Sequence, residues 1–393
     1  MMRKKLVVAG GGFAGLWAAL AAKRQLRSDA GIDVCLVSRD LYLTLRPRLY
    51  EADPAVMRVP LADTLDPVGV ELIIDDIEDI DAPARELITR QGALIYDRLV
   101  LATGSRQRTL AVPGAGYCHD IDSYAGALRL DARLKALVNS ATETQCIVIV
   151  GAGFTGIELA TELRSRLAGF GRSAESMKIL LIDSASAVGP ELGANPRPEI
   201  ERALDKAGVE RRLGVRIGRI GPDGIELADG EILPAGVVVN CTGLEANPLT
   251  RSLGTRIDAS GRLHVDDELR VESVADVYAA GDSALARTDA AGHHTLMSCQ
   301  HALLTGRFAG HNAACDLLGR PGVPYRQPRY LTCLDLGATG AVVTQGWDRQ
   351  VFLTGAAASK LKRDINTNWI YPPTGTAEHI LAQAALPEEE AAA

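Results

Sequence analysis

Two glycine-rich turns in this chain have the residue types and the spacing that bind the phosphates of a dinucleotide. They are Gly10-x-Gly12-x-x-Gly15 and Gly151-x-Gly153-x-x-Gly156. In such a turn the first glycine permits a tight bend, the second lets the backbone approach a pyrophosphate, and the third lets the following helix pack closely on the strand. The N–H groups at the start of that helix then hold the phosphates. The sequence therefore predicts two dinucleotide sites in one chain.

An acid follows the second turn at the position that selects the nucleotide. Asp183 ends the next apolar strand, where a carboxylate accepts hydrogen bonds from both hydroxyls of an NADH ribose and repels a 2′-phosphate. No Arg or Lys occurs in residues 184–187. We therefore expect NADH to be preferred over NADPH. In the first unit the same position is Ser38, followed by Arg39, so a serine hydroxyl can bond the ribose and the arginine can lie over an adenine.

Two further acids stand beside expected helix starts. Asp282 ends a strand-like run, where its carboxylate can accept a hydrogen bond from a cofactor hydroxyl or can cap the next helix. Glu158 lies two residues after Gly156, where the helix dipole stabilises an acid whatever its function. Each of these two acids therefore has both a structural and a functional interpretation.

The elements that must position these residues occur twice in the same order. Leu6–Ala9 and Ile147–Val150 are apolar strand-like runs that lead into the glycine turns, and a helix follows each turn. Each unit then shows hairpin signals and closes on a strand and a Thr-Gly pair, Thr103-Gly104 and Thr242-Gly243. This repeat predicts an α/β protein with two Rossmann-like dinucleotide-binding domains, each of three layers with a β-meander, plus a small C-terminal α+β domain.

Length and charge narrow the class of protein. A chain of 393 residues suits two or three domains, and we expect helices over residues 123–138 and 297–318. A formal net charge of −7 argues against a nucleic-acid partner, because the chain has no broad basic face that could bind phosphates.

The N-terminal apolar run does not indicate a signal peptide. The run after Lys5 leads directly into the glycine turn, so we interpret it as a strand. No stretch approaches the roughly 18 apolar residues of a spanning helix, and we expect a soluble cytoplasmic protein.

The seven cysteines form neither a metal site nor a redox pair of close spacing. None of them makes a C-x-x-C motif, and we predict no metal. Cys35, Cys146 and Cys241 lie in apolar strand-like runs and are expected to be core residues. Cys118 and Cys333 lie elsewhere, and whether either is redox-active stays open.

Together these motifs resemble the two-dinucleotide-domain FAD/NAD(P)-dependent pyridine nucleotide oxidoreductases, and most of all the type II NADH dehydrogenase group. The motifs that carry the resemblance are Gly10–Gly15, Ala102-Thr103-Gly104, Gly151–Glu158, Tyr278–Asp282, and Gln300-His301-Ala302 with Gly306. The resemblance implies a discontinuous FAD-binding domain (1–112 and 245–320), an NADH-binding domain (113–244) and a C-terminal interface domain with a disordered tail (321–393).

The same resemblance implies a role for individual residues. Glu158 is expected where nicotinamide meets flavin, and Gln300 and His301 are expected under the isoalloxazine ring, all three as catalytic residues. The residues implied for FAD are Gly10, Gly12, Phe13, Ala14, Gly15, Ser38, Arg39, Arg46, Ile77, Ala102, Thr103, Gly104, Gly281 and Asp282. Those implied for NADH are Gly151, Gly153, Phe154, Thr155, Gly156, Asp183, Thr242 and Gly243.

Two stretches depart from the family pattern. Leu304-Thr305 stands where the family has a polar pair, often glutamines, on the quinone side of the site. Membrane-bound relatives end in amphipathic helices, whereas here Pro372-Pro373 stops the basic run 360–370. We expect that run to be a solvated face, with at most weak and salt-sensitive contact with a membrane surface.

The resemblance implies an FAD-dependent NADH dehydrogenase that passes hydride from NADH to FAD and on to a second acceptor. We expect a quinone in that place, and otherwise a small redox protein. The alternatives are a sulfide:quinone oxidoreductase, which uses cysteines at the flavin, and an FAD- and NADH-binding redox sensor or assembly protein with little turnover. The acceptor, the pathway and the oligomeric state stay open, with a homodimer as one arrangement.

The choice between NADH and NADPH gives a direct test of Asp183. A 2′-phosphate would face this carboxylate and remove its ribose bonds, and unpaired polar groups are costly, so we expect roughly tenfold or higher kcat/KM for NADH. Steady-state kinetics with both nucleotides measure the ratio. Equal kcat/KM values would contradict Asp183 as the selecting residue.

Overall fold

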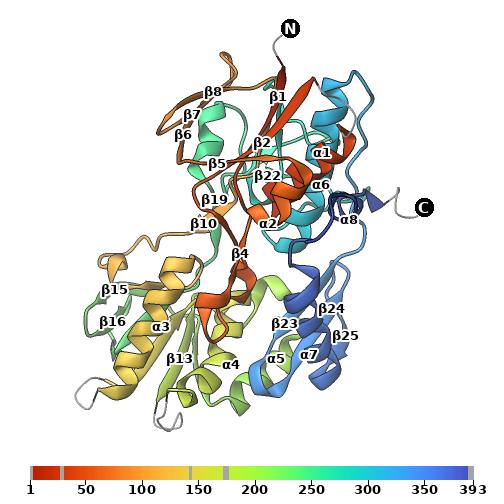
Figure 1. Cartoon of the computed structure of the whole chain (residues 1–393). Helices are drawn as coiled ribbons and strands as arrows, with labels where there is room; N and C mark the ends of the chain where they lie inside the picture. Colours follow the sequence, from red (N-terminus) through yellow and green to blue (C-terminus); the bar gives the residue numbers. More distant parts are fainter. Residues whose placement is uncertain (1–2, 27–30, 141–143, 171–176, 388–393) are drawn as a thin grey trace.

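The structure, a computed structural model, describes residues 3–26, 31–140, 144–170 and 177–387. Figure 1 shows three parts. The N-terminal segment and the teal to cyan segment that ends in α6 lie together at the top. The yellow and green segment lies below them, and most of the blue C-terminal segment lies beside the yellow and green one. Two parts are α/β units around parallel sheets and the third is a small α+β unit, so the expected fold class is confirmed.

Apolar strands build the first sheet. It has five parallel strands in the order β21 (Val277–Ala279), β9 (Arg98–Leu101), β1 (Lys4–Ala9), β2 (Ile32–Ser38) and β5 (Glu71–Ile74). One face packs against α1 (Phe13–Gln25) and α6 (Cys299–Leu317). The other face packs against the meander β6 (Ile77–Asp81), β7 (Glu86–Thr89) and β8 (Gly92–Ile95). Because both faces are covered, the sheet needs apolar residues on both, as its sequence provides.

Small residues set the close packing of α6 on α1. A Cβ atom at Gly306 would lie 2.3 Å from the carbonyl oxygen of Ala14, and one at Gly310 would lie 2.0 Å from that of Ala18. Only glycine leaves room for so close an approach of two helix backbones. This contact fixes the N-termini of α1 and α6 relative to each other.

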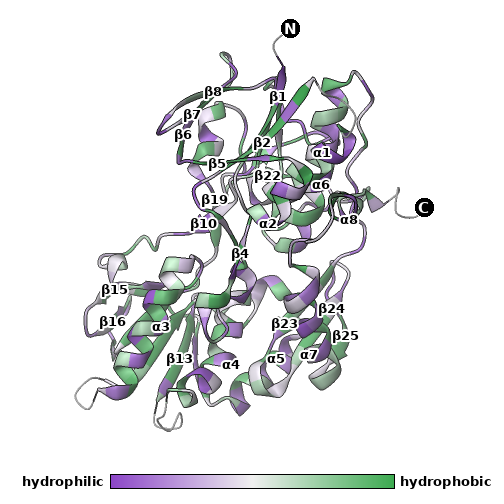
Figure 2. Cartoon of the chain, in the orientation of Figure 1, coloured by the Kyte–Doolittle hydropathy of each residue, from purple (hydrophilic) through white to green (hydrophobic). Residues whose placement is uncertain are grey.

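The second sheet repeats the first. Its five parallel strands follow the order β11 (His119–Asp120), β18 (Val237–Asn240), β12 (Cys146–Val150), β13 (Lys178–Asp183) and β14 (Val209–Leu213). The helices of this unit are α3 (Tyr124–Asn139), α4 (Phe154–Ala168) and α5 (Arg197–Lys206), and its meander is β15 (Ile217–Gly221), β16 (Gly224–Leu227) and β17 (Ile232–Pro234). The predicted helix over 123–138 is α3, capped by Ser123, whose Oγ accepts from the Gly126 N–H at 3.1 Å. In Figure 2 α3 carries both hydrophobic and hydrophilic residues, as a helix with one face on a sheet requires.

Two antiparallel strands carry the chain between the two units. β10 (Ser105–Gln107) leaves the first unit and β19 (Leu244–Ala246) returns to it, and the pair lies between the two sheets in Figure 1. Leu110 and Val112, which the expected boundary leaves in the first unit, pack against the core of the second sheet. The crossing therefore lies at β10, before the boundary expected after residue 112.

The C-terminal part is a three-stranded antiparallel sheet with a helix on it. The elements are β23 (Leu331–Asp335), β24 (Ala341–Gln345), β25 (Gln350–Thr354), α7 (Gly355–Asp364), a π-helical turn (Ile365–Trp369) and α8 (Ala377–Gln383). After α7 the chain returns to the first unit, where Arg307 of α6 donates a hydrogen bond to the Ala385 carbonyl at 3.3 Å. The last residues of the tail expected to be disordered, 388–393, lie outside the described part of the chain.

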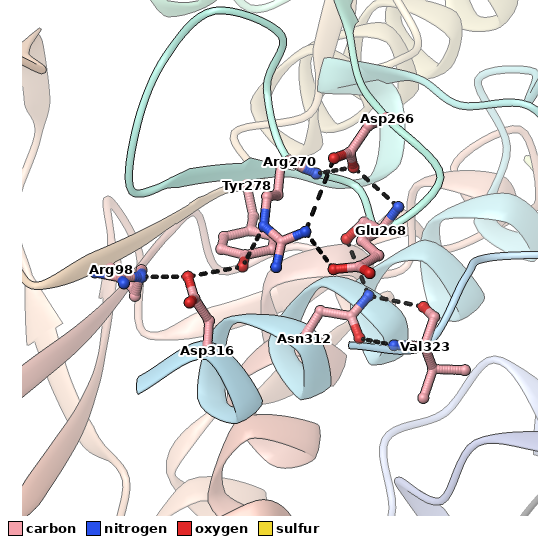
Figure 3. Close-up of polar contacts among 8 residues, drawn as sticks. All are labelled: Arg98, Asp266, Glu268, Arg270, Tyr278, Asn312, Asp316 and Val323. Carbon is pink, nitrogen blue, oxygen red and sulfur yellow. Dashed lines mark hydrogen bonds and ion pairs between the residues drawn. The ribbon is translucent and has the colours of Figure 1, made fainter. Parts of the chain in front are cut away.

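A polar network fixes the far end of α6 to the edge of the first sheet (Figure 3). Asp316 accepts hydrogen bonds from Arg98 Nε at 2.6 Å and from the Tyr278 hydroxyl at 3.1 Å, and that hydroxyl accepts from Arg270 Nε at 3.1 Å. One turn earlier, Asn312 donates to two backbone carbonyls of neighbouring loops at 2.9 Å. With its C-terminal end held in this way, α6 presents its N-terminus at a defined place.

The chain also has short strands and one short α-helix outside these sheets. They are β3 (Tyr42–Thr44), β4 (Arg58–Pro60), α2 (Ala62–Leu65), β20 (Leu263–His264) and β22 (Ala284–Leu285). In the part of the chain that the structure describes, every helix is too short or too polar to pass through a membrane.

Candidate active site

A cavity of about 1180 Å³ lies between the two α/β units and the C-terminal domain. Both glycine turns reach it, because each follows the carboxyl end of a central parallel strand, where open α/β sheets bind their ligands. The N-terminus of α6, β23 and α7 supply the other walls. The predicted residues that line the cavity are Gly12, Phe13, Ala14, Arg46, Ala102, Gly104, Gly151, Gly153, Phe154, Thr155, Glu158, Asp183, Thr242, Gly243, Gly281, Asp282 and Gln300.

The first glycine turn has the geometry of a pyrophosphate site. Gly10 has φ +118°, and a Cβ atom there would lie 2.3 Å from the Ala102 carbonyl oxygen. A Cβ atom at Gly15 would lie 1.7 Å from the Gly10 carbonyl oxygen, so Gly10 and Gly15 shape the turn beneath the cavity. At Gly12 nothing lies within 4 Å of such an atom. The backbone at Gly12 and the N-terminus of α1 are therefore open to a ligand's phosphates.

Asp282 and Arg46 lie on the same side of the cavity. Asp282 follows β21 and accepts a hydrogen bond from the Ser105 hydroxyl at 2.6 Å. Arg46, in a short 3-10 turn, pairs with Asp122 of the second unit. The first turn and the N-terminus of α1 offer N–H donors for phosphates, and Asp282 offers an acceptor for cofactor hydroxyl groups. This set of donors and acceptors fits FAD.

Six residues expected to bind FAD are not in the cavity lining: Gly10 and Gly15, which shape the turn, and Ser38, Arg39, Ile77 and Thr103. Ser38 is buried beneath the glycine turn, and its hydroxyl donates to the Asp40 carbonyl at 2.8 Å. Arg39 points to solvent and pairs with Asp76 at 2.8 Å. Ile77 packs in the core between the first sheet and its meander, and the Thr103 hydroxyl lies 3.5 Å from that of Ser283. The last four therefore have contacts within the fold, and their role toward FAD stays a prediction.

In the second unit, two carboxylates accept hydrogen bonds from backbone N–H groups of the glycine turn. Asp183 lines the cavity and accepts hydrogen bonds from the Ala152 N–H at 2.6 Å and the Ala185 N–H at 2.7 Å. Glu191, which the sequence analysis did not single out, accepts from the Phe154 N–H at 2.8 Å. Asp183 is thus held at the end of its strand, and a second acid sits at the start of α4.

A buried ion pair joins the second unit to the C-terminal domain at the cavity wall. Lys362 Nζ of α7 lies 2.8 Å from Glu158 Oε1 of α4, and the two side chains are 9% and 5% exposed. The same oxygen accepts the Asp335 N–H at 3.0 Å, and Lys362 also donates to the Cys333 carbonyl at 3.0 Å. The expectation that the basic run 360–370 is a solvated face is therefore wrong at Lys362.

Burial sets the protonation of this pair. Burial raises the pKa of Glu158 to about 7, although the Lys362 ammonium acts in the opposite direction. Burial also raises the pKa of Glu162, one turn along α4, to about 7, with Asp335 adding to the effect. The Tyr50 hydroxyl donates to Asp335 at 2.9 Å and closes this cluster beside the cavity. A carboxyl that titrates near neutral pH thus lines the cavity.

His301 lies behind the cavity wall and not in it. It is 2% exposed and packs against Tyr330, with ring centres 5.1 Å apart. Its Nδ1 accepts from the Leu296 N–H at 3.4 Å, which places the ring proton on Nε2. Burial lowers the pKa of His301 to about 4, so the ring is neutral at neutral pH. His301 therefore supports Tyr330, and only Gln300 of the predicted pair lines the cavity.

Arg349 is a second residue that the sequence analysis missed. It lines the cavity from the turn between β24 and β25, is 6% exposed, and stacks on Tyr330 with its guanidinium carbon 4.5 Å from the ring centre. Among the described residues no carboxylate pairs with it, and its buried Nη1 has no hydrogen-bond partner. A buried charge without a counter-charge is costly, so Arg349 is a candidate for binding an electron-rich oxygen of a ligand.

The two cysteines left open have different positions. Cys333 of β23 lines the cavity, whereas Cys118 packs beside the core of the second sheet. Burial raises the pKa of both thiols to about 11, which keeps them protonated at neutral pH and poor nucleophiles. All seven cysteines are free thiols.

Removal of one partner of the buried ion pair tests how much the pair contributes to the free energy of unfolding. Lys362→Met leaves the Glu158 carboxylate buried without its counter-charge, and we expect the free energy of unfolding to fall by about 3–5 kcal/mol. Lys360→Met, at an exposed position of the same helix, should change it by less than about 0.5 kcal/mol. Urea unfolding followed by circular dichroism measures both. Equal effects of the two substitutions would contradict the role of the pair.

Comparisons with known proteins identify the family of this chain. Residues 4–306 match the family described as pyridine nucleotide-disulphide oxidoreductase. An NADH dehydrogenase-like protein of Mycobacterium tuberculosis is 46% identical over 97% of this chain and 98% of its own. A type II NADH:quinone oxidoreductase of Staphylococcus saprophyticus is 25% identical over 94% of this chain and 96% of its own.

Solved structures share the fold. The sulfide:quinone oxidoreductase of Aquifex aeolicus superposes with a TM-score of 0.77 at 18% identity, covering 99% of this chain and 94% of that one. The water-forming NADH oxidase of Lactobacillus brevis, solved with NADH bound, gives a TM-score of 0.71 at 22% identity over 91% of this chain and 77% of that one. The chain therefore belongs to the pyridine nucleotide-disulphide oxidoreductase family and is close to the type II NADH dehydrogenases.

Proposed function

We propose that this chain is an NADH dehydrogenase that uses FAD and delivers the electrons to a quinone. The observation that carries the proposal is that one cavity joins both glycine turns, Asp183, Asp282 and the Glu158–Lys362 pair. Two dinucleotides bound along these turns would therefore share one cavity. The names of the relatives from Mycobacterium and Staphylococcus support the same activity.

The residues of the first unit hold FAD in this proposal. The N–H groups at the start of α1 bind the pyrophosphate above Gly12, and Asp282 accepts hydrogen bonds from hydroxyl groups of the cofactor. The N-terminus of α6 stabilises negative charge at the ring system. When bound, FAD supplies the redox chemistry, accepting hydride from NADH and releasing two electrons to an acceptor.

The second unit and the C-terminal domain orient NADH and supply a proton. Asp183 would bind the ribose hydroxyls of NADH, and Glu158 lies in the lining of the same cavity. A quinone takes up two protons with its two electrons. Glu158 lines the cavity with a pKa of about 7 and is bonded to the Lys362 ammonium, so it is suited to release a proton near neutral pH.

Other residues of the same cavity lining suit a quinone. A quinone ring is flat and apolar, and its two carbonyl oxygens need hydrogen-bond donors. Gln300 and Arg349 supply donors there, and Leu331, Trp369 and Ile370 supply apolar walls.

Leu304-Thr305 stands where the family has a polar pair, and this difference agrees with the assignment of Arg349 to the quinone. The Thr305 hydroxyl is fully buried and bonds the His301 carbonyl at 2.6 Å and the Gly281 N–H at 2.9 Å, so it is engaged within the fold. Arg349 takes over as the polar group on the quinone side.

Substitution of Arg349 tests the quinone site separately from the NADH site. Arg349→Gln removes the charged donor, and we expect about a tenfold higher KM for a short-chain quinone because a charged hydrogen bond is lost. The rate at which NADH reduces the bound flavin should stay unchanged. Steady-state kinetics and anaerobic rapid mixing measure the two quantities.

Lys360→Gln makes the same change of net charge at an exposed position and serves as the control. An unchanged quinone KM in Arg349→Gln would contradict the placement of the quinone. A screen of the unsubstituted protein with quinones, sulfide and small redox proteins tests the function itself. Rapid reduction of the flavin by sulfide and not by NADH would replace the proposal with sulfide oxidation.

A further inference from the structure

The two phosphate sites of this chain differ in what occupies them. At Gly12 nothing lies within 4 Å of an added Cβ atom, and no side chain caps α1. At Gly153, the corresponding glycine of the second turn, the nearest atom is Glu191 Oε1 at 2.6 Å. The space above the second glycine, which a pyrophosphate needs, thus holds a carboxylate of the chain itself.

Glu191 also uses a donor that a phosphate would use. Its Oε1 accepts the Phe154 N–H, in the first turn of α4, at 2.8 Å. Among the described residues no basic side chain pairs with Glu191. A carboxylate and a phosphate at one helix N-terminus repel each other and compete for the same N–H groups.

The backbone that carries Glu191 is held in place. The residue lies in a 3-10 turn, Pro190–Leu192, between Gly189 (φ +56°) and Gly193 (φ +75°). The Gly189 N–H donates to the Ala152 carbonyl at 2.8 Å, and the Asn195 side chain donates to the Asp348 carbonyl at 2.8 Å. The Glu191 residue itself is exposed. Rotation of this one side chain would remove the three atoms that lie nearest to the space above Gly153.

We propose that Glu191 competes with the pyrophosphate of NADH for the N-terminus of α4 and so sets the affinity of the chain for the nucleotide. NADH binds when the carboxylate turns out to solvent, and the energy of the lost hydrogen bond reduces the net affinity. FAD, at the open first turn, meets no such competitor. The inference rests on the proposed NADH site and adds a residue that weakens that site.

Binding measurements without turnover test the competition. Isothermal titration calorimetry of the FAD-loaded protein with NAD⁺ and with ADP-ribose gives dissociation constants for ligands that carry the pyrophosphate. We expect Glu191→Gln and Glu191→Ala to bind both ligands about three- to tenfold more tightly than the unsubstituted chain, with unchanged FAD content. Glu226→Gln, an exposed acid on β16 of the same unit, makes the same change of net charge and should bind as the unsubstituted chain does.

The possible outcomes separate this inference from the proposed function. Equal or weaker binding by the Glu191 variants would overturn the inference, since weaker binding makes Glu191 a ligand of the nucleotide and not its competitor. Equal tightening in Glu226→Gln would also overturn it, because the effect would then be one of net charge. Failure of every variant to bind NAD⁺ and ADP-ribose would overturn the proposed NADH site itself.

Discussion

The buried ion pair between Glu158 and Lys362 is the constraint on which the arrangement of this protein depends. Its two members come from α4 and α7, so the pair forms only when the C-terminal domain is docked on the second unit. Taking two charges out of water is costly, and the pair lowers that cost only with good geometry and additional hydrogen bonds. Asp335 and Cys333 supply those bonds from the backbone of β23. The walls of the cavity are thereby assembled from parts far apart in the sequence.

The strand–glycine turn–helix unit occurs twice, and the two copies differ in how open their phosphate sites are. Both glycine turns follow a central parallel strand and open the same cavity, yet the first is free and the second is bonded by Glu191. The first turn thus suits a cofactor that stays bound. The second, where a side chain must move first, suits a substrate that enters and leaves with each turnover.

Local motifs made much of the fold and part of the site predictable. The glycine turns and Asp183 each depend on neighbours within one strand–turn–helix unit, so spacing was sufficient to find them. Lys362 and Arg349 could not be found in this way, because their positions follow from docking of the C-terminal domain. A basic residue in a basic run gives no sign of burial. Ser38 and Arg39 were assigned by analogy with an acid that this chain lacks, and their side chains bond elsewhere.

The most direct test of the account is anaerobic double mixing of the FAD-loaded protein, first with NADH and then with a short-chain quinone. The flavin absorbance reports both steps. The account predicts rapid bleaching by NADH and rapid recovery on addition of the quinone. Bound flavin that NADH leaves unbleached, or bleached flavin that the quinone does not reoxidise, would contradict it.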